Sequence, residues 1–367
     1  MNFSKEQLYV RQICLQEFGD AGQKKLENAR VLIVGCGGLG NAVAVYLAAS
    51  GIGNLVLIDD DEVSLNNLHR QVFFTVNDVG SSKAEVLAGY IRSINPFVSV
   101  SAKKMRLDKS NYLNVLNGID LVVDCTDSLP TKYLINDICV IHELPLVYGS
   151  LYKFDGYLAS FNVKHEGGYS ANLRDAFPEP PKNPVPNCAE VGTLNPVVGI
   201  IALLQTNEVI KLISGIGEPL TNQLLVYNTL NNQQLKVKLH AKTDKKQIEA
   251  LFKKESYDDG ACELQDPQLL ISSRVLKDHM SQDAWYLISV IENADTLLPF
   301  SVNSRIPFSK FDPKALAVDQ NKKYVFVCNK GILSYTATLK LKEIYPGLEV
   351  FSLENGIHGF IGEQAQA

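Results

Sequence analysis

The sequence has no closely paired cysteines. A disulfide framework or a thiolate zinc site needs such pairs, and no two of the seven cysteines form a CxxC motif; they lie at positions 14, 36, 125, 139, 188, 262 and 328. The spacing therefore argues against both features. We expect a chain without zinc that folds in a reducing, cytoplasmic compartment.

Long apolar runs and an excess of positive charge are also missing. The longest apolar stretch, residues 194–204, contains Asn195 and Pro196 and is too short to span a bilayer. The first residues have neither the apolar core nor the cleavage site of a signal peptide. The formal net charge is −5. Nothing in the composition therefore favours a membrane or a nucleic acid as a partner.

The length and the apolar content are sufficient for two globular domains. The chain has 367 residues, more than one average domain, and 46% of them are hydrophobic, enough for complete cores. Residues 246–266 are rich in charge and have little periodicity. We therefore predict a first domain over 1–245, a linker over 246–266 and a second domain over 267–367.

In the first domain, strand patterns alternate with helical patterns. Apolar runs at 30–35, 55–58 and 121–125 are typical of strands buried on both faces, and helical patterns follow them at 39–50, 81–94 and 130–142. A short strand is expected at 145–149. The alternation predicts an α/β fold with a mostly parallel, Rossmann-type sheet.

The pattern changes after residue 154. Strands at 156–163 and 223–239, around a helix at 196–214, predict an antiparallel extension of the sheet. The proline-dense residues 177–186 predict an exposed crossover loop, because proline cannot donate a backbone hydrogen bond.

A glycine motif joins the first strand to the first helix of this pattern. It contains Gly35, Gly37, Gly38 and Gly40. Glycine lets the backbone approach a phosphate closely, and a helix N-terminus supplies N–H donors. Asp59 ends the next strand, where a ribose hydroxyl would need a carboxylate. The motif predicts a nucleotide site, but most motifs of this kind bind NAD or FAD, so by itself it does not distinguish ATP from a dinucleotide.

Polar and cationic residues follow the second strand. Asn66, Asn67 and Arg70 lie in one loop, and Lys83 opens the next helix. An arginine and a lysine near a phosphate-binding loop can neutralise and orient a triphosphate. Asp127 follows the third strand, at the edge where open α/β sheets bind ligands, and is a candidate magnesium ligand. The set favours ATP over a dinucleotide.

These segments resemble the MoeB/ThiF (HesA/MoeB/ThiF) family, adenylyltransferases related to the ubiquitin-activating enzymes. The resemblance covers about residues 5–240. Within that range, residues 11–13 and 186–192 match the family as well. It implies a homodimer that uses ATP and Mg²⁺ to adenylate the C-terminal glycine carboxylate of a small ubiquitin-like sulfur-carrier protein ending in Gly-Gly.

The resemblance also implies roles for individual residues. Gly38 and Asp59 would hold the nucleotide; Asn67, Arg70 and Lys83 would grip the phosphates; Asp127 would coordinate magnesium; Arg11 would reach into the partner's site; and Cys188 occupies the position of a cysteine that can link to the carrier. Ser128 stands where the family usually has asparagine. Many relatives bind zinc through two CxxC pairs, which here would fall near 170–173 and after residue 239. Both pairs are missing, so we expect no zinc.

In the second domain, strands are expected at 285–290, 323–328 and 348–353, with a helix after residue 334. Cys328 ends the middle strand before a loop and a helix N-terminus, whose N–H groups can stabilise a thiolate or persulfide. This part resembles the rhodanese domain over about 267–363. However, Ser289, Ile291 and Leu333 replace an acid and two arginines of that family. An active sulfurtransferase and a degenerate docking or structural domain therefore both stay open.

The leading hypothesis is adenylation of a MoaD- or ThiS-like carrier, preparing it for thiocarboxylate formation in molybdopterin or thiazole biosynthesis. A cysteine desulfurase or another sulfur donor would be a further partner. One alternative, an NAD-dependent oxidoreductase, does not explain Arg11, Arg70, Lys83 and Asp127 together. The other, a non-catalytic scaffold that binds a ubiquitin-like protein, does not explain the phosphate-gripping residues. The sequence does not identify the carrier or the pathway.

Overall fold

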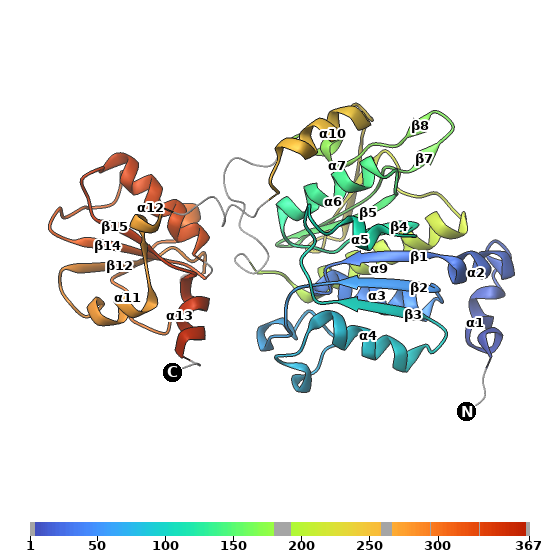
Figure 1. The fold of residues 1–367 in the computed structure, drawn as a ribbon, viewed down its shortest axis with the longest axis horizontal. Helices are drawn as coiled ribbons and strands as arrows, with labels where there is room; N and C mark the ends of the chain where they lie inside the picture. Colours follow the sequence, from blue (N-terminus) through green and yellow to red (C-terminus); the bar gives the residue numbers. More distant parts are fainter. Residues whose placement is uncertain (1–3, 180–191, 258–265, 294, 330, 365–367) are drawn as a thin grey trace. The chain divides into compact units, whose positions relative to one another are not determined.

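The computed structural model describes residues 4–179, 192–257, 266–293, 295–329 and 331–364. The described residues form two compact units, the first over 4–179 and 192–257 and the second over 266–364 (Figure 1). Cys188 and most of the proline-dense stretch lie outside the described residues. Each unit is considered by itself.

The first unit is built on an eight-stranded sheet in the order β10-β9-β6-β5-β4-β1-β2-β3. The strands from β3 to β5 in this order are parallel, whereas β6, β9 and β10 are antiparallel to their neighbours. This confirms the mostly parallel sheet with an antiparallel extension. The strands are β1 (Arg30–Val34), β2 (Asn54–Ile58), β3 (Ser99–Lys103), β4 (Leu121–Asp124), β5 (Leu146–Tyr152), β6 (Asp155–Phe161), β9 (Gln223–Asn228) and β10 (Gln233–Lys238). A separate hairpin joins β7 (Lys164–His165) to β8 (Gly168–Tyr169).

Helices cover both faces of this sheet, with α4 on one side and α6 and α10 on the other (Figure 1). Alternate residues of β1 explain why two faces need cover: Val31 and Ile33 belong to the apolar cluster with α3, α4 and α9, and Leu32 and Val34 to the one with α6. The helices are α1 (Lys5–Ile13), α2 (Gly19–Asn28), α3 (Gly38–Ala49), α4 (Lys83–Ile94), α5 (Leu113–Leu116), α6 (Leu129–Ile141), α7 (Leu173–Ala176), α9 (Asn195–Ser214) and α10 (Lys245–Lys254).

Among the described helices, α9 is long and apolar enough to cross a membrane by length and composition alone. Half of its most apolar stretch is buried, and it packs against α3, β5 and β6. These contacts are those of a core helix in a globular unit.

The edge strand β3 and the end of the first unit differ from the sequence predictions. The edge strand β3 was not predicted, because it has no continuous apolar run and none of its residues is fully buried. The predicted linker start at residue 246 is wrong, because α10 packs on α6 and the first unit continues to Tyr257. Ile248 of α10 is completely buried, which anchors this charged helix.

The second unit is a five-stranded, all-parallel sheet in the order β11-β15-β14-β12-β13. It confirms a second, small α/β domain. The elements are β11 (Leu270–Ile271), α11 (Ser273–His279), β12 (Trp285–Ser289), β13 (Ser304–Arg305), β14 (Lys323–Val327), α12 (Ile332–Ile344), β15 (Val350–Leu353) and α13 (Gly356–Gln364).

Candidate nucleotide-binding site

The glycine loop connects β1 to α3 and has no room for a side chain at Gly35 or Gly40. Gly35 has a φ of +90°, and a Cβ there would lie 2.8 Å from the carbonyl oxygen of Cys125. A Cβ on Gly40 would overlap the carbonyl oxygen of Gly35. Gly37 is the N-cap of α3, and Gly38 opens that helix. The glycines therefore leave the backbone at the N-terminus of α3 uncovered by side chains, the arrangement that suits a phosphate.

Asp59 closes the other side of this loop. Its carboxylate accepts hydrogen bonds from the backbone N–H of Cys36 at 2.6 Å and of Asp61 at 2.8 Å. Burial raises the pKa of Asp59, and the positive charge of Lys83 partly offsets that rise. The residue that follows β2 is thus fixed against the glycine loop.

Lys83 and Asp61 form an ion pair beside Asp59. The Nζ atom of Lys83 lies 2.6 Å from a carboxylate oxygen of Asp61, and the side chains are 6% and 68% exposed, respectively. The backbone N–H of Lys83 also donates to the carbonyl of Asp61. The cation is therefore held at the first turn of α4 with an exposed anion as its partner.

Arg70 lies next to the first turn of α3. Its Cδ atom is 3.9 Å from the position that a Cβ on Gly38 would occupy. Its guanidinium donates to the carbonyl oxygen of Asn66 and to Oδ1 of Asn67, each at 3.2 Å. Asn66 and Asn67 therefore orient the guanidinium in this structure.

Gln71 belongs to the same cluster and was missed by the sequence analysis. It is 2% exposed, and its Nε2 atom donates to Oδ1 of Asn67 at 3.1 Å. Its Oε1 atom has no hydrogen-bond partner in the described part of the chain. Its place directly after Arg70 was the signal that could have drawn attention to it.

Asp127 and Ser128 follow β4, the strand beside β1. Asp127 is exposed. Ser128 is the N-cap of α6 and accepts a hydrogen bond from the backbone N–H of Thr131 at 3.3 Å. The nearby Asp124 is completely buried and forms an ion pair with Lys132. Lys132 is the second residue that the sequence analysis missed. Asp127 thus offers an accessible carboxylate at this strand end.

Three predicted site residues lie apart from this cluster. Arg11 is exposed on α1, Cys188 lies outside the described residues, and Cys328 belongs to the second unit. The other predicted residues come from the glycine loop and from the segments that follow β2 and β4.

Cys328 is enclosed by its own loop. Its sulfur accepts hydrogen bonds from the backbone N–H of Gly331 at 3.2 Å and of Ser334 at 3.3 Å, and the Ser334 hydroxyl lies 3.2 Å from it. The residue is only 1% exposed. The predicted N–H groups at the start of α12 therefore do surround this sulfur.

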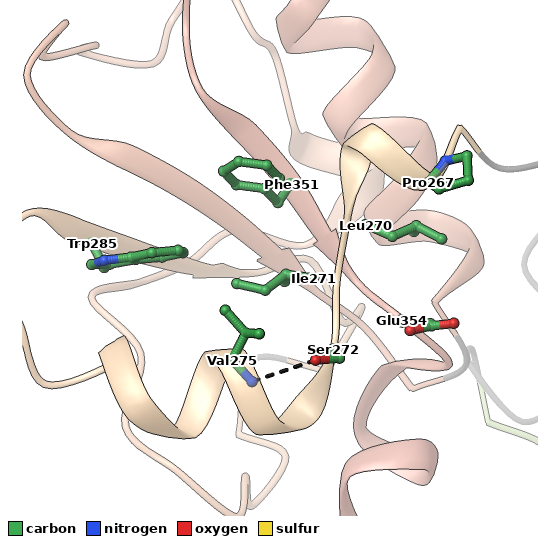
Figure 2. Close-up of a pocket in the computed structure, with 8 residues that line it drawn as sticks. All are labelled: Pro267, Leu270, Ile271, Ser272, Val275, Trp285, Phe351 and Glu354. Carbon is green, nitrogen blue, oxygen red and sulfur yellow. Dashed lines mark hydrogen bonds between the residues drawn. The ribbon is translucent and has the colours of Figure 1, made fainter.

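The second unit also has a cavity of about 390 Å³ at the edge strand β11 (Figure 2). Trp285 and Phe351, whose rings stack at 6.2 Å, line it together with Leu270, Val275 and Glu354. Cys328 does not line this cavity.

The fold and the residues at the strand ends define a nucleotide-binding α/β unit. The sequence matches the ThiF family over residues 9–249, and the chain belongs to that family. This membership decides against the NAD-dependent oxidoreductase.

Relatives match the chain over different lengths. The chain is 42% identical over 234 residues to the sulfur carrier protein adenylyltransferase of Thermus thermophilus, covering 63% of this chain and 86% of that protein. It is 35% identical over 349 residues to the probable adenylyltransferase/sulfurtransferase MoeZ of Mycobacterium tuberculosis, covering 91% and 88%. The crystal structure of E. coli MccB with ATP superposes with a TM-score of 0.52 at 27% identity, covering 60% of this chain and 67% of that one.

Proposed function

We propose that this chain uses ATP to adenylate the C-terminal glycine carboxylate of a small ubiquitin-like sulfur-carrier protein. The observation that carries the proposal is the cluster of Arg70, Lys83 and Asp59 around the glycine loop of a ThiF-family unit. The names of the relatives support the same chemistry, since they include a sulfur carrier protein adenylyltransferase and an adenylyltransferase/sulfurtransferase.

The reaction needs no nucleophile from this chain. A carboxylate oxygen of the carrier attacks the α-phosphorus of ATP in line, the bond to the bridging oxygen breaks, and pyrophosphate leaves. The work of the enzyme is positioning and charge neutralisation. Lys83 and Arg70 supply positive charge. To contact a phosphate, Lys83 must leave its ion pair with Asp61. Asp59 would accept a further hydrogen bond from a ribose hydroxyl.

Asp127 fits a magnesium ligand, because its carboxylate is exposed while that of Asp124 is engaged by Lys132. When bound, magnesium would neutralise phosphate charge. The proposal also includes a cytoplasmic homodimer in which the exposed Arg11 acts on the partner's site. MoaD- or ThiS-like proteins are the proposed carriers, in molybdopterin or thiazole biosynthesis.

A sulfur relay through the second unit is the further part of the proposal. The enclosed sulfur of Cys328 supports it, as does the adenylyltransferase/sulfurtransferase that matches across both units. A cysteine desulfurase or another sulfur donor would load this residue, and Cys188 would be a second site of linkage to the carrier.

Pyrophosphate exchange tests the adenylation step. With ATP and a carrier ending in Gly-Gly, the chain should exchange labelled pyrophosphate into ATP. Arg70→Ala should keep the fold and lower the exchange about a hundredfold or more, because a preorganised cation is lost from the phosphates. Arg92→Ala, on the exposed side of α4, is the matched control and should exchange normally. Normal exchange by Arg70→Ala would refute its role, and binding of a carrier without exchange would favour the scaffold.

A further inference from the structure

A buried ion pair lies directly beneath the Asp127 loop. The Nζ atom of Lys132, on α6, is 3.1 Å from a carboxylate oxygen of Asp124, the last residue of β4. The two side chains are 3% and 0% exposed. Neither residue of the pair contacts the substrates in the proposed reaction.

Lys132 and Asp124 each make further polar contacts besides the ion pair. Lys132 also donates to the carbonyl oxygen of Gly149 at 2.7 Å, and its Nζ atom lies 4.9 Å from the centre of the Tyr148 ring. The second carboxylate oxygen of Asp124 accepts from the backbone N–H and the hydroxyl of Thr126, at 3.0 Å and 2.7 Å. The pair therefore joins α6 and β5 to the first turn after β4.

The backbone of the same strand end is held from α9. Nε2 of Gln205 donates to the carbonyl oxygen of Asp124 at 2.8 Å. Thr126 is thus fixed through Asp124, one residue before Asp127. Ser128, one residue after Asp127, is fixed as the N-cap of α6. Asp127 itself is exposed between these two anchored neighbours.

Stability alone does not account for such a pair. Desolvating two charges costs several kcal/mol per ion, and apolar residues of similar volume often replace a buried pair without loss of stability. What apolar residues would not supply is the hydrogen bonding that shapes the turn over residues 124–128. The pair also neutralises Asp124, so that Asp127 is the acid of that turn without an ion-pair partner among the described residues.

We propose that Lys132 is a positioning residue for the metal site of the adenylation reaction. By pairing with Asp124 inside the sheet, it fixes the turn from which Asp127 presents its carboxylate to a divalent cation bound with ATP. The inference rests on the proposed function, because it assigns a support to the metal ligand of that same site.

The decisive variant removes both charges together, because Lys132→Met alone would leave Asp124 buried and unpaired. Asp124→Asn/Lys132→Met keeps the size of both side chains and should fold. Its affinity for Mn²⁺, measured by electron paramagnetic resonance with a non-hydrolysable ATP analogue, should fall about tenfold or more, as for other outer partners of metal ligands. Binding of the analogue without metal should stay unchanged.

Two further variants separate positioning from general stability. Asp137→Asn/Arg174→Met removes another buried pair, also 3% and 0% exposed and with Asp137 likewise on α6, and should lower the melting temperature without changing Mn²⁺ affinity. Lys132→Arg keeps the charge and should retain Mn²⁺ binding, including in the case that the double variant does not fold.

Wild-type Mn²⁺ affinity in the folded Asp124→Asn/Lys132→Met variant would overturn the inference. Loss of Mn²⁺ binding in Lys132→Arg equal to that in the double variant would also overturn it, as would failure of the wild-type chain to bind Mn²⁺ with the analogue. The proposed function fails separately, if wild-type chain shows normal metal and nucleotide binding but no pyrophosphate exchange with any carrier.

Discussion

At the scale of single residues, Cys328 lies in a loop whose sequence resembles that of the rhodanese domain. Backbone N–H groups point at it, and the Ser334 hydroxyl beside it accepts a hydrogen bond from Ser352 at 2.8 Å. The three positions that would carry an acid and two arginines in that family are instead buried side chains of Ser289, Ile291 and Leu333. Stabilisation of an anionic sulfur therefore falls on the loop amides, the hydroxyl and the start of α12.

We predict that Cys328 carries a persulfide after treatment with a sulfur donor. The full chain would be incubated with a cysteine desulfurase and cysteine, and the modified residue located by mass spectrometry. Cys328→Ser should abolish sulfur transfer to the adenylated carrier, because no other residue of the loop offers a thiol. Cys14→Ser removes an exposed thiol of the first unit and serves as the control. Unchanged transfer by Cys328→Ser would leave the second unit a docking or structural domain.

The glycine motif and Asp59 could be predicted from the sequence because both lie next to strands with strong apolar patterns. Lys132 could not be predicted, and the one sequence signal for Gln71 was its place directly after Arg70. Lys132 sits in a helical pattern where lysine is ordinarily exposed, and its partner Asp124 becomes a neighbour only after β4 and α6 pack together. The relation of Gln71 to the glycine loop likewise depends on the path of the chain after β2.

At the scale of elements, a carboxylate joins the two segments in which the absent CxxC pairs would fall. Asp175 of α7 accepts hydrogen bonds from the backbone N–H of Lys242 at 3.0 Å and of Thr243 at 2.9 Å, and from the Thr243 hydroxyl at 2.8 Å. Its other oxygen accepts from the backbone N–H of Asn172. The start of α7 and the segment before α10 are therefore connected by direct hydrogen bonds.

We predict that Asp175→Ala loosens this connection. The loss of several hydrogen bonds to one ionised side chain should lower the free energy of unfolding of the first unit by about 1–3 kcal/mol. Amide hydrogen exchange at Lys242 and Thr243 should become faster. Glu218→Ala, an exposed acid of the same unit, should change neither quantity. Unaltered exchange at both amides in Asp175→Ala would contradict this account.

Two of the elements that the sequence did not predict, β3 and α10, share a physical cause. β3 lies at the edge of the sheet and α10 on the surface, so each buries few side chains and carries a weak apolar pattern. The central strands β1, β2 and β4 are buried on both faces and gave clear patterns. For these strands and this helix, the extent of burial separates the predicted elements from the missed ones.

At the scale of the whole molecule, the first unit ends later than the sequence predicted. Beyond residue 245, Ile248 is buried, Glu255 pairs with Arg174 at 2.6 Å, and the Tyr257 hydroxyl bonds to Asp137. These contacts complete the environment of a buried arginine. α10 and the residues that follow it, up to Tyr257, are therefore part of the first unit.

We predict opposite results for two truncated chains. A chain ending at residue 257 should fold and retain carrier-dependent pyrophosphate exchange. A chain ending at residue 245 should lose about 3 kcal/mol or more of stability, because it exposes the α6 surface and removes partners of a buried charge. Thermal unfolding followed by circular dichroism would measure both. Equal melting temperatures would mean that α10 contributes nothing to the stability of the unit.

The edge strand β10 of the large sheet has a consequence for the behaviour of the protein in concentrated solution. β10 pairs only with β9 among the described strands, and all six of its residues are exposed, including Leu235 and Val237. A free, partly apolar edge of this kind can template the growth of aggregates. Lys236 and Lys238 alternate with the apolar pair, so joining two such edges would crowd like charges together. The two lysines thus oppose edge-to-edge association of the sheets and favour solubility.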